Sequence, residues 1–232
     1  MLKNLSIILK KGAGTSIYKK MFYDFTKRII DLIGSIVLLI LFSPVLICIP
    51  LLIKLDSPGP IFVEKSTRVG KGKKLFYMYK FRSMIANARE LMRTDPKFRQ
   101  LYAKYKQNSY KLKDDPRVTR VGRLIRRFSL DELAQIFNIL KGEMSLVGPR
   151  AYYPDELEQQ QKVYPQSQKY VKQLLRAKPG ITGYWQVQGR SEINFDKRVK
   201  MDADYVEQRS VLKDLMIIFR TPWAMLSGKG AL

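Results

Sequence analysis

The sequence predicts a helix-rich α/β protein that is associated with a membrane through a re-entrant helix hairpin and that contains a small β-hairpin. Three observations lead to this prediction. An uncharged apolar run spans 32–53 and is interrupted near its middle by a proline. Apolar residues recur at helical spacing in most later segments, and two short aromatic or β-branched stretches flank a turn that contains glycines. The chain accordingly divides into a basic amphipathic segment (1–26), a membrane hairpin (27–57) and a main domain (58–232).

The composition predicts anionic partners and excludes several chemistries. Lys and Arg number 43 against 20 Asp and Glu, which gives a formal charge of +23. Such a charge attracts nucleic acid, phosphorylated substrates or an anionic membrane surface. The chain has no histidine, so Ser-His and Cys-His couples and His-ligated zinc sites are excluded. A single cysteine, Cys48, excludes a disulfide within the chain, and carboxylates, lysines, tyrosines and hydroxyls remain as reactive groups.

The apolar run is long enough to cross a bilayer, because a spanning helix needs about 20 such residues. Ser43 and Pro44 stand near its middle, and a proline there removes a backbone donor and kinks or breaks the helix. Basic residues flank the run on both sides, and basic flanks tend to stay cytoplasmic. We therefore expect a hairpin that enters and leaves on one face, with Asp31 at the level of the lipid headgroups. A proline-kinked spanning helix and a buried core helix are the alternatives.

The main domain follows a turn cluster at 56–60. Its first half is expected to contain strands over 61–64 and 75–81 joined by the turn 68–74, and then helical segments over 83–93, 95–113 and 118–128. Its second half is expected to contain a helix from Ser129 to Lys141 capped by Gly142, a helix over 164–177, a loop with a short strand over 181–190, and helices over 194–208 and 212–220. The apolar stretch 221–226 is suited to a membrane interface.

An adjacent acidic pair, Asp131 and Glu132, is the best candidate for chemistry in a chain without histidine. The simplest interpretation is a capping box, in which Ser129 caps the helix and Glu132 bonds back to it. The surroundings favour a second role, because arginines precede the pair and a helix start is itself an anion site. Adjacent carboxylates can hold Mg²⁺ together with substrate phosphates, and a carboxylate can also attack phosphorus. Arg150, after a Gly-Pro turn, is a candidate for a second phosphate contact.

Several motifs in one order resemble the bacterial sugar transferases, the monotopic polyprenyl-phosphate phosphoglycosyl transferases that start surface-glycan synthesis. The motifs are KFRSM (80–84), RRFSLDEL (126–133), NILKGEMSLVGPR (138–150), KPGITGYWQVQGRS (178–191) and DADYV (202–206). The resemblance covers the chain from about Lys27 to its C-terminus. It departs at Ala151, where the family commonly has a second proline. It also departs in the multiple N-terminal spanning helices of larger members, so we expect a minimal or truncated form.

The resemblance implies transfer of a sugar 1-phosphate from a nucleotide diphosphate sugar, usually a UDP-sugar, to polyprenyl phosphate, with Mg²⁺ as cofactor. The residue matching Asp131 is the nucleophile, and the one matching Glu132 assists it and engages the metal. The motifs place Arg126, Arg150, Lys80 and Arg82 as phosphate-binding residues, and Pro149, Gly180, Thr182, Gln186, Arg190 and Asp202 as substrate-binding residues. The break at Ser43 and Pro44 implies a re-entrant hairpin, with 58–232 as a helix-rich α/β catalytic domain on the cytoplasmic face of the bacterial inner membrane.

The implied reaction is a ping-pong transfer through an aspartyl-phosphosugar. The partners are then the donor sugar nucleotide, polyprenyl phosphate and anionic membrane lipid, without nucleic acid, and homodimer formation is compatible with this. One alternative is a transferase in which Asp131 only holds Mg²⁺. Another is a non-enzymatic, membrane-attached basic adaptor that binds anionic lipid or nucleic acid. The adaptor explains the charge and the apolar run, but it does not explain the ordered motifs.

Overall fold

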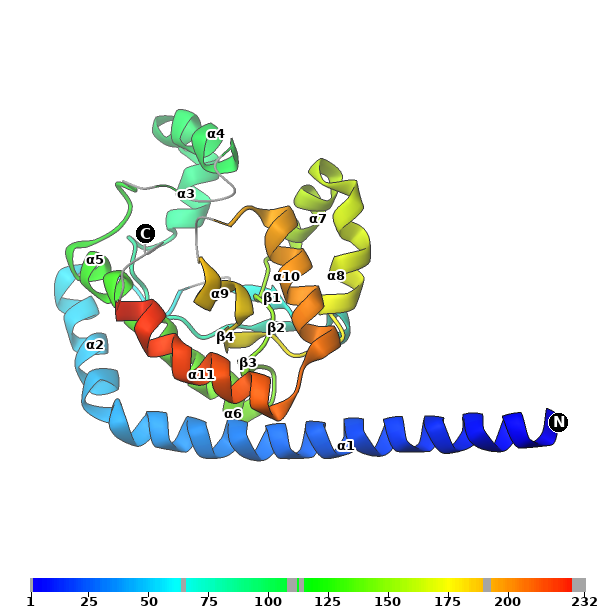
Figure 1. Ribbon diagram of the computed structural model, residues 1–232. Helices are drawn as coiled ribbons and strands as arrows, with labels where there is room; N and C mark the ends of the chain where they lie inside the picture. The colour runs from blue at the N-terminus through cyan, green and yellow to red at the C-terminus, as the bar shows by residue number, and fades with distance from the viewer. Residues whose placement is uncertain (1, 64–65, 108–111, 113–114, 190–192, 227–232) are drawn as a thin grey trace.

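Two helices that meet at a sharp bend begin the chain (Figure 1). The computed structural model describes residues 2–63, 66–107, 112, 115–189 and 193–226. Helix α1 (Leu2–Leu41) ends one residue before helix α2 (Ser43–Asp56), and the apolar parts of the two helices are inclined at 63°. Pro44 lies in the first turn of α2, and the Ser43 hydroxyl donates a 2.8 Å hydrogen bond to the carbonyl of Ile40. The predicted break at Ser43 and Pro44 is therefore confirmed.

The bend separates two described helices, neither of which meets the requirements for a membrane-crossing helix by itself. Among the described residues, no single helix combines the length and the apolar composition that a crossing requires. The helices α1 and α2 reach that threshold only as a bent pair. This geometry is compatible with a broken span or with a re-entrant hairpin, and insertion into a membrane stays a prediction.

Short helices and very short strands make up the rest of the chain, which confirms the helix-rich class with a small β-hairpin. The strands are β1 (Thr67–Val69), β2 (Leu75–Tyr77), β3 (Ser145–Val147) and β4 (Gly180–Thr182). The helices are α3 (Ala88–Thr94), α4 (Arg99–Gln107), α5 (Arg120–Arg127), α6 (Ile136–Lys141), α7 (Pro154–Val163), α8 (Gln168–Leu174), α9 (Tyr184–Gln188), α10 (Phe195–Gln208) and α11 (Val211–Leu226). The 3₁₀ turns are η1 (Lys71–Lys73), η2 (Pro96–Phe98), η3 (Leu130–Gln135) and η4 (Pro165–Ser167).

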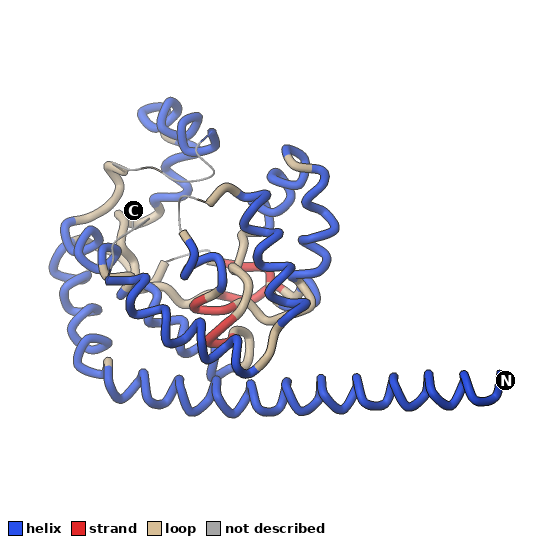
Figure 2. Tube along the Cα trace, in the orientation of Figure 1, coloured by secondary structure: helices blue, strands red, loops and turns tan. Residues whose placement is uncertain are grey.

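Two two-stranded sheets lie among the helices, as the red segments of Figure 2 show. Strands β1 and β2 form the antiparallel hairpin, with Arg68 opposite Phe76. Strands β3 and β4 pair in parallel, with Ser145 opposite Gly180. A side chain at Gly180 would collide with the backbone nitrogen of Gly148, so this close approach of the two segments requires glycine.

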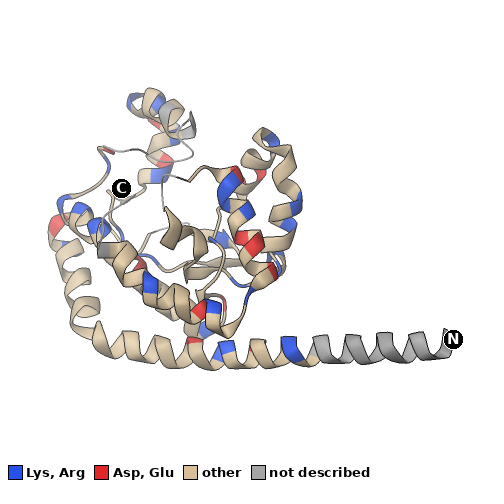
Figure 3. Ribbon diagram, in the orientation of Figure 1, with Lys and Arg blue, Asp and Glu red and all other residues tan. Residues whose placement is uncertain are grey.

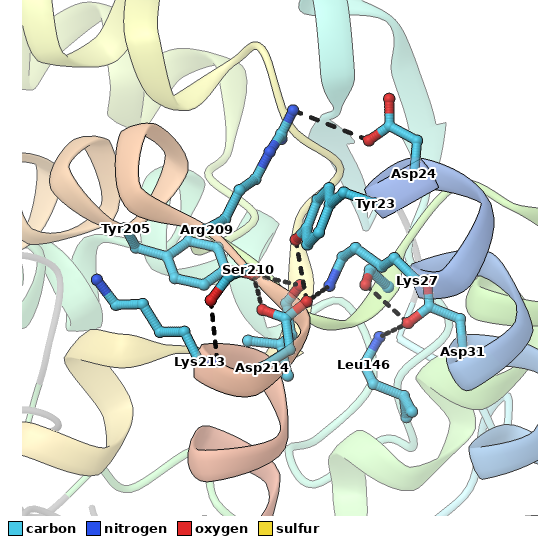
Figure 4. Close-up of polar contacts among 12 residues, drawn as sticks. Tyr23, Asp24, Lys27, Asp31, Leu146, Tyr205, Arg209, Ser210, Lys213 and Asp214 are labelled. Atoms are coloured by element: carbon cyan, nitrogen blue, oxygen red, sulfur yellow. Dashed lines mark hydrogen bonds and ion pairs between the residues drawn. The ribbon is translucent and has the colours of Figure 1, made fainter. Parts of the chain in front are cut away.

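Helix α1 is held against the domain by buried carboxylates (Figure 4). Asp214 of α11 is 2% exposed and lies 2.7 Å from the ammonium group of Lys27. The same carboxylate accepts hydrogen bonds from the hydroxyls of Tyr23 (3.0 Å) and Tyr205 (2.6 Å). Because a buried charge is tolerated only when it is paired and hydrogen-bonded, this cluster specifies where α1 docks.

A second carboxylate, Asp31, is buried against the domain, and its expected position at the headgroup level stays a prediction. It is buried and accepts hydrogen bonds from the Ser145 hydroxyl (2.8 Å) and the Leu146 amide (2.9 Å) at strand β3. One turn earlier, Arg28 donates to the carbonyls of Ile139 and Leu140 at the end of α6. The polar residues at the start of the apolar run therefore face the domain, because they complete hydrogen bonds there.

An apolar face remains exposed on the outer sides of α1, α2 and α11. In Figure 3 this part of α1 and α2 is free of charged residues around the bend. Large exposed apolar surfaces on a folded protein mark contact with a partner or a membrane. The exposed side chains include Phe22, Phe25, Ile33, Ile36, Ile40, Ile47, Leu51 and Leu55, with Leu212, Phe219 and Trp223 on α11.

Several predicted boundaries were wrong for identifiable reasons. The first hairpin strand is Thr67–Val69 and not 61–64, where the described residues form only an isolated bridge between Phe62 and Phe81. Helix α3 begins at Ala88 and not at 83, because Asn87 has a left-handed backbone (φ 54°). Helix α7 and the short helix α9 were not predicted, and α11 runs through Pro222 to Leu226. The expected segment 95–113 is helical over η2 and α4, and its later part lies outside the described residues.

We expect Asp214→Asn to loosen the docking of α1. The amide cannot pair with Lys27 and offers one acceptor oxygen to two hydroxyls, so the free energy of unfolding should fall by about 3 kcal/mol. For a chain of this size, that corresponds to a fall in Tm of roughly 6–12 °C in thermal unfolding of the detergent-solubilised protein.

Asp24→Asn is the matched control, because that carboxylate is 46% exposed and lies 4.0 Å from Arg209. An exposed pair of this kind contributes at most about 1 kcal/mol. Equal losses in the two variants would contradict the docking role of Asp214.

Candidate functional site

A polar depression opens between the β-hairpin, the acidic pair and the segment that carries β4 and α9. It encloses about 480 Å³ of empty space, including its open mouth. Three cationic side chains and one acidic side chain contribute to the wall, so the depression favours an anionic ligand. The lining residues are Arg68, Met78, Lys80, Glu132, Gln135, Arg150, Ala151, Gly180, Ile181, Trp185 and Gln186.

Lys80 joins the acidic pair to this cavity. Its ammonium group lies 2.9 Å from Asp131 Oδ2 and 3.4 Å from Glu132 Oε1. Burial lowers the pKa of Lys80, but the charges of Asp131 and Glu132 outweigh that effect and hold this pKa above its ordinary value. Asp131 is 3% exposed and does not itself line the cavity, whereas Glu132 does. The structure thus brings Asp131, Glu132 and Lys80 together, and the role of Lys80 in binding phosphate stays a prediction.

The backbone around the pair differs from the predicted capped α-helix. Ser129 has a left-handed backbone (φ 54°), and its side chain makes no capping hydrogen bond. The pair lies in the 3₁₀ turn η3, and α6 begins only at Ile136. The capping box is therefore wrong, although the closing cap at Gly142 (φ 80°) is confirmed.

The segment that follows β2 and carries Lys80 is tied to the acidic segment by backbone and side-chain hydrogen bonds. The Phe81 amide donates to the carbonyl of Asp131 (2.9 Å). The buried Asn138 side chain accepts from the Tyr79 amide (2.9 Å) and donates to the Tyr77 carbonyl (2.7 Å). These bonds fix the spacing between Lys80 and the carboxylates.

The two other predicted arginines of this region lie outside the cavity wall. Arg82 is buried, and its guanidinium donates hydrogen bonds of 2.5–2.9 Å to Ser57, Pro58 and Pro60. Arg82 therefore stabilises the turn that follows α2. Its guanidinium was expected to contact phosphate, but in the structure it binds the backbone and side chain of this turn. Arg126 donates to the Ser83 hydroxyl (2.8 Å) and lies near Lys80, where its charge opposes that of the ammonium.

Arg150 lines the cavity through the loop after β3. Its amide donates to Asp202 Oδ2 (3.0 Å), and its guanidinium carbon lies 5.6 Å from the Trp185 ring. Burial alone lowers the pKa of Arg150. Glu156 and other acidic groups raise it by more than burial lowers it, so the pKa lies above its ordinary value and the guanidinium stays charged. Asp202 is fully buried and thus supports the loop from behind, and it does not line the cavity.

Behind Arg150 lies a group of buried polar atoms that have no hydrogen-bond partner among the described residues. Such atoms are ordinarily satisfied by internal water or by a ligand. Four of them are nitrogen or hydroxyl groups and one is a carboxylate oxygen: Arg150 Nε, Tyr152 OH, Trp185 Nε1, Arg198 Nε and Asp202 Oδ1.

The remaining predicted substrate residues divide into two groups. Gly180 and Gln186 line the cavity. Pro149 and Thr182 do not: the Pro149 carbonyl accepts from the Gly180 amide (2.9 Å), and Thr182 is buried 2.8 Å from the Thr221 hydroxyl. These two residues hold the β3–β4 contact that shapes the wall. Arg190 lies outside the described residues.

Sequence reasoning missed Arg68 as a site residue and counted it only among the basic residues near the apolar run. The structure buries it on β1 and places it in the cavity wall. A usable signal was its position in the hairpin, where Thr67 is exposed and Arg68 points inward. A charged residue at an inward position of a strand needs a partner or a ligand.

The acidic pair fits a magnesium ion only with help from a substrate. No group of three or more acidic or sulfur ligands occurs within the described part of the chain. Mg²⁺ commonly uses one or two carboxylates and takes its other ligands from phosphates and water. Asp131 and Glu132 supply that minimum, and Lys80 at present contacts both.

Comparisons with known proteins agree with the motifs. Residues 22–228 match the family model described as bacterial sugar transferase. An undecaprenyl-phosphate galactose phosphotransferase of Salmonella typhimurium is 44% identical over 211 residues, which are 89% of this chain and 42% of that protein. An undecaprenyl-phosphate glucose phosphotransferase of Komagataeibacter xylinus is 40% identical over 200 residues, 84% of this chain and 35% of that protein. The exopolysaccharide production protein ExoY of Sinorhizobium fredii is 38% identical over 210 residues, 89% of this chain and 88% of that protein. The chain thus spans less than half of the first two relatives and most of the third.

We expect Asp202→Asn to change how stability depends on pH. Burial raises the pKa of Asp202 to about 7 from an ordinary 3.8, so the folded state binds its proton more tightly than the unfolded state does. This contribution to stability is complete below about pH 4 and is lost as the pH rises toward 7. The Tm of the wild type relative to Asp202→Asn should therefore decline across that interval and become constant above it. A constant difference between pH 4 and pH 8 would contradict the raised pKa.

Proposed function

This chain belongs to the bacterial sugar transferase family, and we propose that it transfers a sugar 1-phosphate from a nucleotide diphosphate sugar to polyprenyl phosphate. Relatives that are named as undecaprenyl-phosphate galactose and glucose phosphotransferases support the acceptor and the class of donor, and UDP-hexose is the donor that we infer. The relative named as an exopolysaccharide production protein supports a role at the start of surface-polysaccharide synthesis.

The observation that carries the proposal is the juxtaposition of a carboxylate pair with a cationic cavity. Lys80 contacts both Asp131 and Glu132, and Arg68 and Arg150 complete the charged wall. Transferred phosphoryl groups carry negative charge that is stabilised mainly by positioned cations and donors. A carboxylate nucleophile is repelled by phosphate in water, and these cations reduce that repulsion.

In the first step, a carboxylate oxygen of Asp131 attacks the phosphorus that bears the sugar. The bond from that phosphorus to the bridging oxygen breaks, and the nucleoside monophosphate leaves with the electron pair. Asp131 then carries the sugar phosphate as an acyl phosphate. For this attack, Lys80 must release Oδ2 of Asp131 and turn its charge toward the phosphate, which requires only a side-chain movement.

In the second step, an oxygen of polyprenyl phosphate attacks the same phosphorus. The bond to the Asp131 oxygen breaks, and the carboxylate returns to its starting state. The acceptor phosphate is already ionised near pH 7, so no strong general base is required. This suits a chain without histidine.

Magnesium completes the proposed site. The carboxylates of Asp131 and Glu132 would hold it together with oxygens of the donor phosphates. When bound, the ion neutralises charge on the phosphates and so favours attack by an anionic nucleophile. Glu132 is the more accessible of the two ligands, because its side chain is 34% exposed and that of Asp131 is 4% exposed.

We further propose that the chain rests on the cytoplasmic face of the bacterial inner membrane through its bent helix pair. The apolar face of α1, α2 and α11 supports this placement, as does the basic character of the chain, which suits anionic lipid. Polyprenyl phosphate would then approach the cavity from the bilayer beside it.

Asp131→Asn should abolish turnover, because an amide is a poor nucleophile. It is also uncharged, so it cannot pair with Lys80 or with a metal ion as the carboxylate does. The measurement is release of nucleoside monophosphate from a panel of nucleotide diphosphate sugars with polyprenyl phosphate present; we expect a loss of at least about 10³-fold. Asp196→Asn, whose side chain does not line the cavity, is the control. Retained turnover in Asp131→Asn would refute its role.

Labelled sugar phosphate should become covalently attached to the wild type when donor and Mg²⁺ are supplied without acceptor. Failure to trap it, with turnover intact, would favour the mechanism in which Asp131 only holds Mg²⁺. If no donor is turned over at all and anionic-lipid binding is the same in the wild type and Asp131→Asn, the basic adaptor becomes the better description.

The hairpin topology is tested by single cysteines at Lys20 and Lys54 in a Cys48→Ser background. Both side chains are exposed, one before the apolar run and one at its end. A re-entrant hairpin predicts that a membrane-impermeant maleimide labels both from the cytoplasmic side. Labelling from opposite sides would establish a kinked spanning helix instead.

A further inference from the structure

We propose that Arg68 binds the phosphate of the donor that leaves with the nucleoside, and that Tyr153 positions its guanidinium for this contact. This inference rests on the proposed function and adds a residue and a division of labour within the cavity. Lys80 and the acidic pair act at the transferred phosphate, and Arg68 acts at the departing one.

Arg68 is a buried cation that faces the cavity and lacks a paired anion. It is 6% exposed, yet no carboxylate of the described residues lies within ion-pair distance of its guanidinium. Within the described residues, its guanidinium makes a long hydrogen bond (3.3 Å) to the neighbouring carbonyl of Thr67 and a hydrogen bond with Tyr153. Burial of an unpaired charge is unfavourable, and proteins keep such groups mainly where a ligand completes them.

The guanidinium is held in place by an aromatic platform. The Arg68 guanidinium carbon lies 3.1 Å from the centroid of the Tyr153 ring, and that of Arg89 lies 3.8 Å from it. Arg89 is in turn fixed by two hydrogen bonds to Asp155 (2.7 and 2.8 Å). Stacking fixes the plane of the Arg68 guanidinium and leaves its edge available for a bidentate contact with phosphate.

The charges around Arg68 call for more than one negative charge in the ligand. Burial lowers the pKa of Arg68 and is the largest effect; Tyr153 raises this pKa through its charge and a hydrogen bond, Arg150 lowers it, and Glu156 raises it from beyond ion-pair distance. The cavity wall therefore brings two guanidinium groups together, and among the described residues the buried Glu156 acts on both of them without an ion-pair contact to either. A diphosphate supplies one phosphate for each end of such a wall, whereas a monophosphate does not.

The division between the two phosphates follows from the partners of each cation. Lys80 contacts the proposed nucleophile directly, so it lies where phosphorus is attacked. Among the described residues no ion pair joins Arg68 to Asp131 or Glu132, and Arg68 lies on β1, whereas Lys80 follows β2. When the bond to the bridging oxygen breaks, the negative charge that develops on the nucleoside monophosphate is placed beside Arg68.

Separation of the two half-reactions tests this assignment. In Arg68→Gln, the single-turnover release of nucleoside monophosphate should slow by about 10²-fold, the scale of losing one charge-stabilising donor group. Transfer from isolated sugar-phosphate-labelled enzyme to polyprenyl phosphate should keep its wild-type rate, because the departing phosphate is absent. Arg99→Gln, an exposed arginine on α4, should leave both steps unchanged. Equal losses in both steps, or none in either, would overturn the assignment.

A binding measurement separates failure of this inference from failure of the proposed reaction. Inorganic pyrophosphate should raise the Tm of the wild type more than that of Arg68→Gln, and this requires neither sugar nor lipid. Without pyrophosphate, the variant should be at least as stable as the wild type, since it no longer buries an unpaired charge. A Tm rise that is equal in both proteins would refute the contact even if turnover is observed, and a larger rise in the wild type supports it even if no donor is turned over.

Tyr153 is tested by its conservative variant. Tyr153→Phe keeps the stacking surface but loses the hydroxyl that hydrogen-bonds with Arg68. It should therefore raise the KM for the donor less than Tyr153→Leu does, and both variants should change the acceptor step less than the donor step. Loss of activity in both variants to the same degree would contradict a positioning role for the ring.

Discussion

The docking of α1 through buried carboxylates is the constraint on which the rest of the structure depends. The Asp214 carboxylate accepts hydrogen bonds from Tyr23 and Lys27 of α1, and the Asp31 carboxylate of α1 accepts them from Ser145 and Leu146 at β3. These bonds form only when α1 lies along α11 and β3. Neither residue is near the cavity, but each fixes an element that frames it. Strand β3 leads into the Arg150 loop, and α11 meets β4 through the hydroxyls of Thr221 and Thr182. The helices that carry the exposed apolar face and the polar cavity therefore belong to one body.

Much of this arrangement could be predicted from the sequence, and the limits have physical causes. The helix break at Pro44, the hairpin, and helices α5 and α10 follow from proline chemistry, glycine and apolar periodicity. The acidic pair was found for a sound reason, since no histidine competes for its role. Its 3₁₀ backbone was not predictable, because tertiary bonds from Phe81 and Asn138 override the local preference for a capped helix.

The roles of arginines were harder to predict, because the side chain is long and its partner is chosen by the fold. Arg82 lies two residues from Lys80 and yet points toward a turn, whereas Arg68 comes from another strand and reaches the cavity. Pro149, Thr182 and Asp202 belong to motifs around the site, but they act on the backbone that shapes it. The motifs thus indicated which segments surround the cavity. Only the contacts in the structure distinguish the residues that line the cavity from those that hold its backbone in place.

The ion pairs of Lys80 have a consequence for selectivity in the resting protein. Because the Lys80 ammonium contacts both carboxylates, Asp131, the proposed nucleophile, is paired with a cation and covered by its side chain. A neutral sugar that enters the cavity has no anionic group to compete with the carboxylates for the Lys80 ammonium, so the ion pairs of Lys80 with Asp131 and Glu132 persist. A ligand with dense negative charge can draw the ammonium away and expose Asp131. Under the proposed mechanism, the negative charge of the substrate therefore determines whether Asp131 is exposed, so only a substrate that carries phosphate reaches an accessible carboxylate.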